Sequence, residues 1–135
     1  LLVMQDFTEK VVLITGSGSG IGRSTALAFA QRGAKVIIVG RRIQTCDETV
    51  HLIENAGGEA IAISTDVTQS EEVERLMQKI IEHHGRLDIA FNNAAIEGTI
   101  APMVDQTEDD FDAVIATNLK GVWLPMKLQV AQMLQ

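Results

Sequence analysis

The chain has 135 residues, of which 46% are hydrophobic, and its formal net charge is -7. This length and composition predict a single domain with a real hydrophobic core. The acidic balance and the absence of a basic run exclude the usual electrostatic signature of nucleic-acid or anionic-membrane binding. No signal peptide is visible, and no apolar run approaches the roughly 20 residues of a membrane-spanning helix. The single cysteine, Cys46, excludes an internal disulfide and fits a protein of the reducing cytoplasm.

The first predicted elements are a buried strand and a helix, separated by a glycine cluster. Residues 11–14 are apolar without alternation, as expected for a strand that is covered on both faces. A helix is predicted over residues 20–32, with Ile21, Ala26 and Ala30 on its inner surface. Gly33 follows where a left-handed cap belongs.

The same alternation of strand and helix continues to the end of the chain. Further strands are predicted over 36–39, 60–63 and 87–91, and further helices over 43–55, 68–84 and from Thr107 onward. Thr68, with Glu71 three residues later, predicts a capping box for the third helix. Short strands joined by helices predict an α/β fold over residues 1–135, with a parallel sheet and helices on both of its faces.

Each predicted strand ends in small or polar residues. These residues are Thr15-Gly16, Gly40-Arg41, Asp66 and Asn92-Asn93. In a parallel sheet these ends share one edge, where ligands of open α/β sheets bind. The glycine cluster at this edge permits a tight turn and a close approach of a diphosphate, and the following helix N-terminus favours an anion. The sequence therefore predicts a nucleotide site at this edge.

The glycine spacing distinguishes between nucleotide-binding motifs. A Walker A loop would need a lysine after its last glycine, where Arg23 stands, so ATP or GTP hydrolysis is disfavoured. The common dinucleotide fingerprint also fails, because its sixth position falls on Ile21 or Arg23. The motif present is Thr15-Gly16-x-x-x-Gly20-Ile21-Gly22.

This motif resembles that of the short-chain dehydrogenase/reductase family. Three further matches follow in the order and spacing of the family: Asp66-Val67, Asn92-Asn93-Ala94, and the segment 117–122 that contains Asn118. The resemblance covers essentially the whole chain. It implies a Rossmann-type, three-layer αβα fold with the strand order 3-2-1-4, and the activity of an oxidoreductase that acts on a small-molecule alcohol or ketone.

The resemblance also implies roles for individual residues. The turn that holds the cofactor pyrophosphate consists of Gly16, Ser17, Ser19, Gly20, Ile21 and Gly22. Asp66 would bind the adenine amino group beside the backbone of Val67, and Asn93 and Ala94 would lie on the ribose side. Asn118 matches the asparagine of the catalytic tetrad, where it holds a helix kink and an ordered water. No metal-ligand spacing is present.

The end of the second predicted strand bears on the choice of nicotinamide cofactor. An acidic residue there binds the ribose hydroxyls of NAD, whereas a nearby arginine accommodates the extra phosphate of NADP. This chain has Gly40 followed by Arg41 and Arg42. We therefore expect NADP(H) to be favoured, with NAD(H) as the alternative.

The chain lacks the family's serine and its Tyr-x-x-x-Lys pair, and contains no tyrosine at all. The family uses that tyrosine to pass a proton to or from the substrate oxygen. The chain also begins without methionine. We interpret it as the amino-terminal, cofactor-binding portion of a longer enzyme, inactive alone. The family resemblance implies that the parent protein is a homo-oligomer. The alternative is a non-catalytic nucleotide-binding or regulatory module of the same fold.

Overall fold

The computed structural model describes residues 6–135. Its strands are β1 (Val11–Thr15), β2 (Lys35–Gly40), β3 (Glu59–Ser64) and β4 (Ile89–Asn92). Its helices are α1 (Gly20–Gln31), α2 (Ile43–Asn55), α3 (Ser70–His84), α4 (Glu108–Ile115) and α5 (Gly121–Met133). A short 3-10 helix, η1 (Met103–Asp105), precedes α4, and a π-helix, η2 (Ala116–Lys120), joins α4 to α5.

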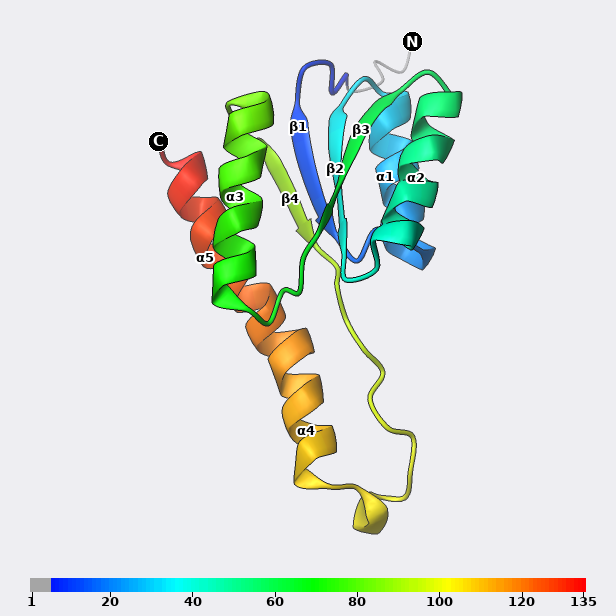
Figure 1. Ribbon diagram of the computed structural model, residues 1–135, viewed down its shortest axis with the longest axis vertical. Coiled ribbons are helices and arrows are strands. Elements are labelled where there is room, and N and C mark those ends of the chain that lie inside the picture. The colour runs from blue at the N-terminus through cyan, green and yellow to red at the C-terminus, as the bar shows by residue number, and fades with distance from the viewer. Residues whose placement is uncertain (1–5) are drawn as a thin grey trace.

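The strands form one parallel sheet in the order β3-β2-β1-β4. In the register, Val12 of β1 lies between Val36 of β2 and Ile89 of β4. Helices α1 and α2 cover one face of the sheet, while α3 and α5 cover the other (Figure 1). The predicted three-layer αβα architecture and its strand order are confirmed.

The central strands bury both faces, which explains their unbroken apolar sequence. On β1, Val12 and Ile14 pack toward α1 and α2, whereas Val11 and Leu13 pack toward α3. All four side chains are at most 1% exposed. On the inner face of α1, Ala26 and Ala30 are buried as predicted.

Ile21 departs from that prediction, because 72% of its surface is exposed. It lies in the first turn of α1, at the edge of the sheet where the helix begins. The strands there have ended, so no facing residue covers the side chain.

The predicted capping box at Thr68 is wrong. Asp66 Oδ1 accepts hydrogen bonds from both the Thr68 amide (2.9 Å) and the Thr68 hydroxyl (2.7 Å). Because Thr68 is held by this local turn, α3 begins later, at Ser70, with Gln69 as an N-cap whose side chain makes no capping bond. The predicted fourth strand, 87–91, is likewise shifted to Ile89–Asn92.

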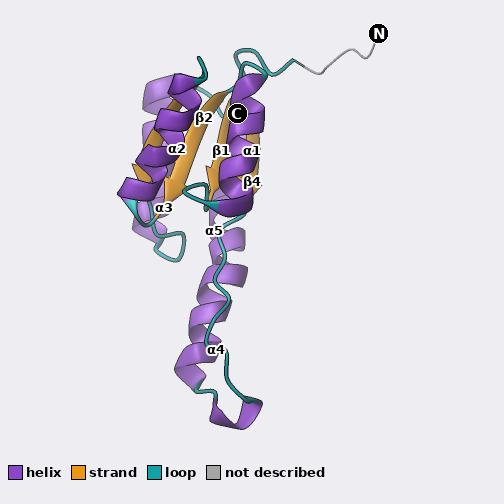
Figure 2. Cartoon of the chain, turned by 90° about the vertical axis from the view of Figure 1, so that its right-hand side faces the viewer, coloured by secondary structure: helices purple, strands orange, loops and turns teal. Residues whose placement is uncertain are grey.

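The predicted long helix from Thr107 is interrupted. A capping box between Thr107 and Asp110 starts α4, which extends away from the sheet (Figure 2). The π-helix η2 then redirects the chain into α5, which packs beside α3. Within residues 6–135 no helix has the length and apolar character required to cross a membrane.

Candidate functional site

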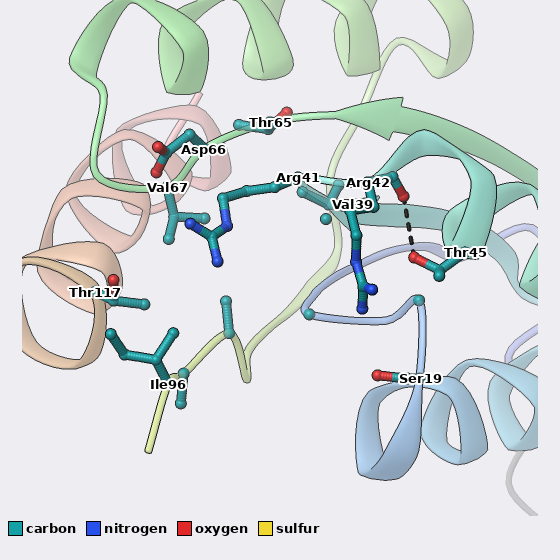
Figure 3. Close-up of a pocket in the computed structure, with 15 residues that line it drawn as sticks. Ser19, Val39, Arg41, Arg42, Thr45, Thr65, Asp66, Val67, Ile96 and Thr117 are labelled. Carbon is teal, nitrogen blue, oxygen red and sulfur yellow. Dashed lines mark hydrogen bonds between the residues drawn. The ribbon is translucent and has the colours of Figure 1, made fainter. Parts of the chain in front are cut away.

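A cavity of about 360 Å³ lies at the carboxyl ends of the strands. Most of the residues within segments 16–19, 39–45, 65–67 and 94–96 line it, together with Thr117 of η2. Figure 3 shows how these segments surround it. The structure therefore brings together the ends of all four strands, as the sequence predicts.

The glycine turn leaves no space for side chains at two of its positions. Gly16 has a φ of +67°, and a Cβ there would lie 2.9 Å from Ala94 Cα. A Cβ on Gly22 would lie only 2.2 Å from the Gly16 carbonyl oxygen. The turn is thus packed against the start of α1 and the end of β4, and its backbone is open to a ligand on the cavity side.

The two predicted serines of this turn point in different directions. Ser17 is buried, and its hydroxyl donates to the Ile14 carbonyl (2.6 Å) and accepts from the Val39 amide (2.9 Å). It therefore ties the turn to β1 and β2 rather than facing the cavity. Ser19 is exposed at the N-terminus of α1, makes no capping bond and lines the cavity (Figure 3). Of the two hydroxyls, that of Ser19 is available to a ligand.

Sequence reasoning missed Arg23, which holds this turn against α2. Its guanidinium donates to the Gly18 carbonyl (2.5 Å), to Thr49 Oγ1 (2.9 Å) and to the Thr45 carbonyl (3.3 Å). It also pairs with Glu48 at 3.0 Å. The sequence contained one indication of this role: a cation in the first turn of a helix is unfavourable near the positive end of the helix dipole, so Arg23 needs partners elsewhere.

Arg41 and Arg42 border the cavity after β2. Neither guanidinium forms an ion pair with any partner among residues 6–135. Figure 3 shows Arg41 extending toward Val67 and Arg42 extending toward the side where Ser19 lies. Since Gly40 contributes no carboxylate, this end of the cavity is positively charged.

Asp66 and Val67 line the cavity after β3. One carboxylate oxygen of Asp66 is engaged by Thr68, and its backbone amide donates to Glu72 Oε1 (3.1 Å). Val67 is buried and packs against the start of α5, where a Cβ on Gly121 would lie 2.8 Å from Val67 Cγ2. These contacts fix the backbone beside the cavity.

Asn93 joins the end of β4 to the glycine turn. Its Nδ2 donates to the carbonyls of Thr15 and Gly16, at 3.2 Å each. The Ala94 amide donates to Thr15 Oγ1 (3.0 Å). The side chain of Asn93 therefore braces the site, whereas Ala94 itself lines the cavity.

Asn118 lies in the π-helix, outside the cavity lining. Its Nδ2 donates to the Ile96 carbonyl and its Oδ1 accepts from the Ile96 amide, both at 2.8 Å. This pair of bonds fastens η2 to the segment after β4, although 22 residues separate the two in sequence. Its neighbour Thr117 lines the cavity instead.

A parallel sheet of this order, with a glycine turn and a cavity at the carboxyl ends of its strands, defines a dinucleotide-binding protein of the Rossmann class. The sequence model of the short chain dehydrogenase family matches residues 10–135. The chain belongs to this family, whose members use NAD or NADP.

Similarity to individual proteins agrees with this assignment. An uncharacterized oxidoreductase of Thermotoga maritima is 46% identical over 128 residues, covering 95% of this chain and 50% of the relative. The structure of an NAD+-bound xylitol dehydrogenase matches with a TM-score of 0.91 and 31% identity, covering 95% of this chain and 49% of the other. A metagenomic short-chain oxidoreductase in complex with NADP matches with a TM-score of 0.88 and 28% identity, covering 93% of this chain and 57% of the other. The chain spans about half the length of the curated relatives it matches.

Proposed function

We propose that this chain forms the cofactor-binding part of an enzyme that interconverts a small-molecule alcohol and its carbonyl compound with NADP(H). NAD(H) is the alternative cofactor. The observation that carries the proposal is the cavity, which joins a glycine turn to two arginines without an ion-pair partner among residues 6–135. A bound nicotinamide cofactor supplies the hydride chemistry, while the protein supplies binding and orientation.

The glycine turn would hold the pyrophosphate. It would consist of Gly16, Ser17, Ser19, Gly20, Ile21 and Gly22, with the Ser17 hydroxyl bracing the turn from behind rather than contacting the cofactor. Gly16 and Gly18 line the cavity, and this supports the role, because residues without side chains let a phosphate approach the backbone. The uncapped start of α1 supports it as well, since its first amides have no side-chain acceptor.

The remaining contacts would follow the other strand ends. Arg41 would pair with the extra phosphate of NADP, since a guanidinium makes strong, charge-assisted bonds to phosphate. Asp66 and the backbone of Val67 would bind the adenine, with Asn93 and Ala94 on the ribose side. Both Asp66 and Ala94 border the cavity, which supports these roles.

Asn118 would act as a positioning residue of the proton relay. Its two bonds to Ile96 hold the π-helix against the segment after β4, which supports such a role. The relay also needs a tyrosine and a lysine, and the 135 residues contain no tyrosine. In this proposal both come from the longer protein.

We also propose that the longer protein is a homo-oligomer. Phe111, Leu119 and Trp123 are large apolar side chains, exposed along α4, η2 and α5. Their exposure along successive elements supports a contact surface in the longer protein.

The cofactor assignment is tested by Arg41→Ala in the full-length protein. Dissociation constants for NADPH and NADH would be measured by fluorescence titration. We expect the Kd for NADPH to rise about tenfold, because a charge-assisted phosphate contact is lost, while that for NADH changes little. Arg32→Ala is the matched control, since Arg32 is exposed at the far end of α1. Equal affinity for both cofactors, unchanged by Arg41→Ala, would refute the assignment.

A second candidate is a non-catalytic nucleotide-binding module of the same fold, which would use the glycine turn and Asp66 at the cavity but no tyrosine. The two candidates differ in what the coding sequence supplies after Gln135. A serine and a Tyr-x-x-x-Lys pair there, with NADPH-dependent carbonyl reduction, support the enzyme. Cofactor binding without that pair and without turnover supports the module.

A further inference from the structure

Gly40 lies at the position where an acidic residue would select NAD. Its φ does not fall in the left-handed region, so the backbone conformation itself does not require glycine. A Cβ at this position would lie 3.0 Å from Cys46 Sγ, whereas ordinary contacts begin at 3.4 Å. Within the described part of the chain, and apart from the residues next to Gly40, no other atom lies within 4 Å of that Cβ. The sulfur is therefore what restricts the residue at position 40.

Cys46 has little freedom to move aside. It is 0% exposed and belongs to the core cluster that includes Ile14 and Ile38. Its amide donates to the Arg42 carbonyl (3.3 Å), which fixes the first turn of α2 directly after β2. A side chain in a close-packed core cannot absorb an added methyl group without strain.

Thr45, the residue before Cys46, restricts Gly18 in the same way. A Cβ on Gly18 would lie 2.6 Å from Thr45 Oγ1. The first turn of α2 is thus in close contact with two glycines that line the cavity, Gly18 in the glycine turn and Gly40 at the end of β2. A shift of this turn to accommodate a side chain at position 40 would therefore also disturb the glycine turn.

We infer that Cys46 is a positioning residue that determines cofactor specificity, because its sulfur keeps position 40 free of a side chain. This inference rests on the proposed function. A carboxylate at position 40 would bind the ribose hydroxyls of NAD and repel the extra phosphate of NADP. Burial raises the pKa of the Cys46 thiol. The sulfur therefore acts on position 40 through its size rather than through a charge.

The steric contact is tested by a double-mutant cycle on the full-length protein. Gly40→Ala adds only the Cβ, and Cys46→Ala removes only the sulfur. We expect Gly40→Ala to lower the Tm by several degrees, and its effect to become much smaller in the Cys46→Ala background. Ile53→Val is the matched control: it removes one methyl group from the same cluster but does not contact position 40. The Tm changes caused by Ile53→Val and Gly40→Ala should simply add. If the Tm changes caused by Cys46→Ala and Gly40→Ala also add, the inference is overturned.

The consequence for specificity is tested with Gly40→Asp, alone and combined with Cys46→Ala. We expect the double variant to bind NADH about tenfold more tightly than wild type, because the new carboxylate adds a charged hydrogen bond to the ribose hydroxyls. It should bind NADPH more weakly, because the same carboxylate repels the extra phosphate. The single variant should lose NADPH affinity without that gain. A full gain of NADH affinity in Gly40→Asp alone, or none in the double variant, would overturn the inference. If the wild type binds NADPH and NADH equally, the proposed NADP preference fails instead. The double-mutant cycle on Tm would still show whether Cys46 restricts the residue at position 40.

Discussion

Arg41 borders the cavity, whereas Arg23 braces the glycine turn behind it, so the two arginines are expected to affect cofactor binding differently. Arg23 is engaged by the Gly18 and Thr45 carbonyls and by Thr49, so it holds the turn that both cofactors use. Arg23→Met should therefore weaken NADPH and NADH binding by a similar factor, about tenfold for the loss of a charged hydrogen bond. Calorimetric titration of the full-length protein with each cofactor measures the two factors.

Arg75→Met is the control for Arg23→Met, because Arg75 is exposed on α3, on the opposite face of the sheet. It should leave both affinities unchanged. A loss confined to NADPH in Arg23→Met would contradict the bracing role, since it would mean that Arg23 contacts the extra phosphate itself.

The sequence predicted which residues gather at the site better than it predicted the direction of each side chain. Gly16, Arg41 and Asp66 border the cavity because the ends of parallel strands share an edge. The opposite orientations of Ser17 and Ser19 depend on how the turn folds over β1 and β2. Arg23 was missed because its partners on α2 are brought to it only by tertiary packing.

At the scale of elements, α4 depends on its N-terminal cap, because it contains no buried residue. Asp110 accepts hydrogen bonds from the Thr99 hydroxyl and from the amide and hydroxyl of Thr107. These bonds, led by that from Thr99, hold the pKa of the Asp110 carboxyl below its usual 3.8. A lowered pKa in the folded state stabilises α4 at pH values above 3.8, and this stabilisation is lost as the pH falls through the folded value.

Asp110→Asn should therefore lower the hydrogen-exchange protection factors of α4 at pH 7 by about fivefold, a typical effect of removing a cap. Below pH 3.8 the difference between the variant and wild type should shrink. Asp109→Asn makes the same change of charge in the same helical turn and should have a smaller effect. Equal effects of the two variants would show that charge near the helix dipole, rather than the cap, stabilises α4.

Two similar motifs show what the sequence could not decide about the elements. Thr68 and Thr107 are each followed three residues later by an acidic residue, but only Thr107 forms a capping box. Asp66 accepts the bonds of Thr68 locally. Asp105 likewise stands two residues before Thr107, but the amide and hydroxyl of Thr107 donate to Asp110 instead. In the long helix, the family resemblance implied a kink at Asn118, and the structure has the π-helix η2 there. Helical patterning alone did not predict this interruption, because the bonds of Asn118 to Ile96 are long-range.

At the scale of the whole molecule, β4 forms one edge of the four-stranded sheet of residues 6–135. Unpaired strand edges promote association, and so do exposed apolar side chains such as those of Phe111, Leu119 and Trp123. We expect the 135-residue chain, expressed alone, to self-associate or to be poorly soluble. Analytical ultracentrifugation over a range of concentrations tests this. A monodisperse monomer with a cooperative thermal transition would contradict it.

Two variants separate the contributions of the edge and the helices. Phe91→Lys introduces a charge on β4, and Leu119→Glu introduces one on η2, where 62% of the leucine surface is exposed. If the helices carry the proposed subunit contact, Leu119→Glu should dissociate the full-length protein as well as the 135-residue chain. Phe91→Lys should improve only the shorter chain, because the full fold would cover that edge. Dissociation of the full-length protein by Phe91→Lys, with no effect of Leu119→Glu, would assign the subunit contact to the strand edge.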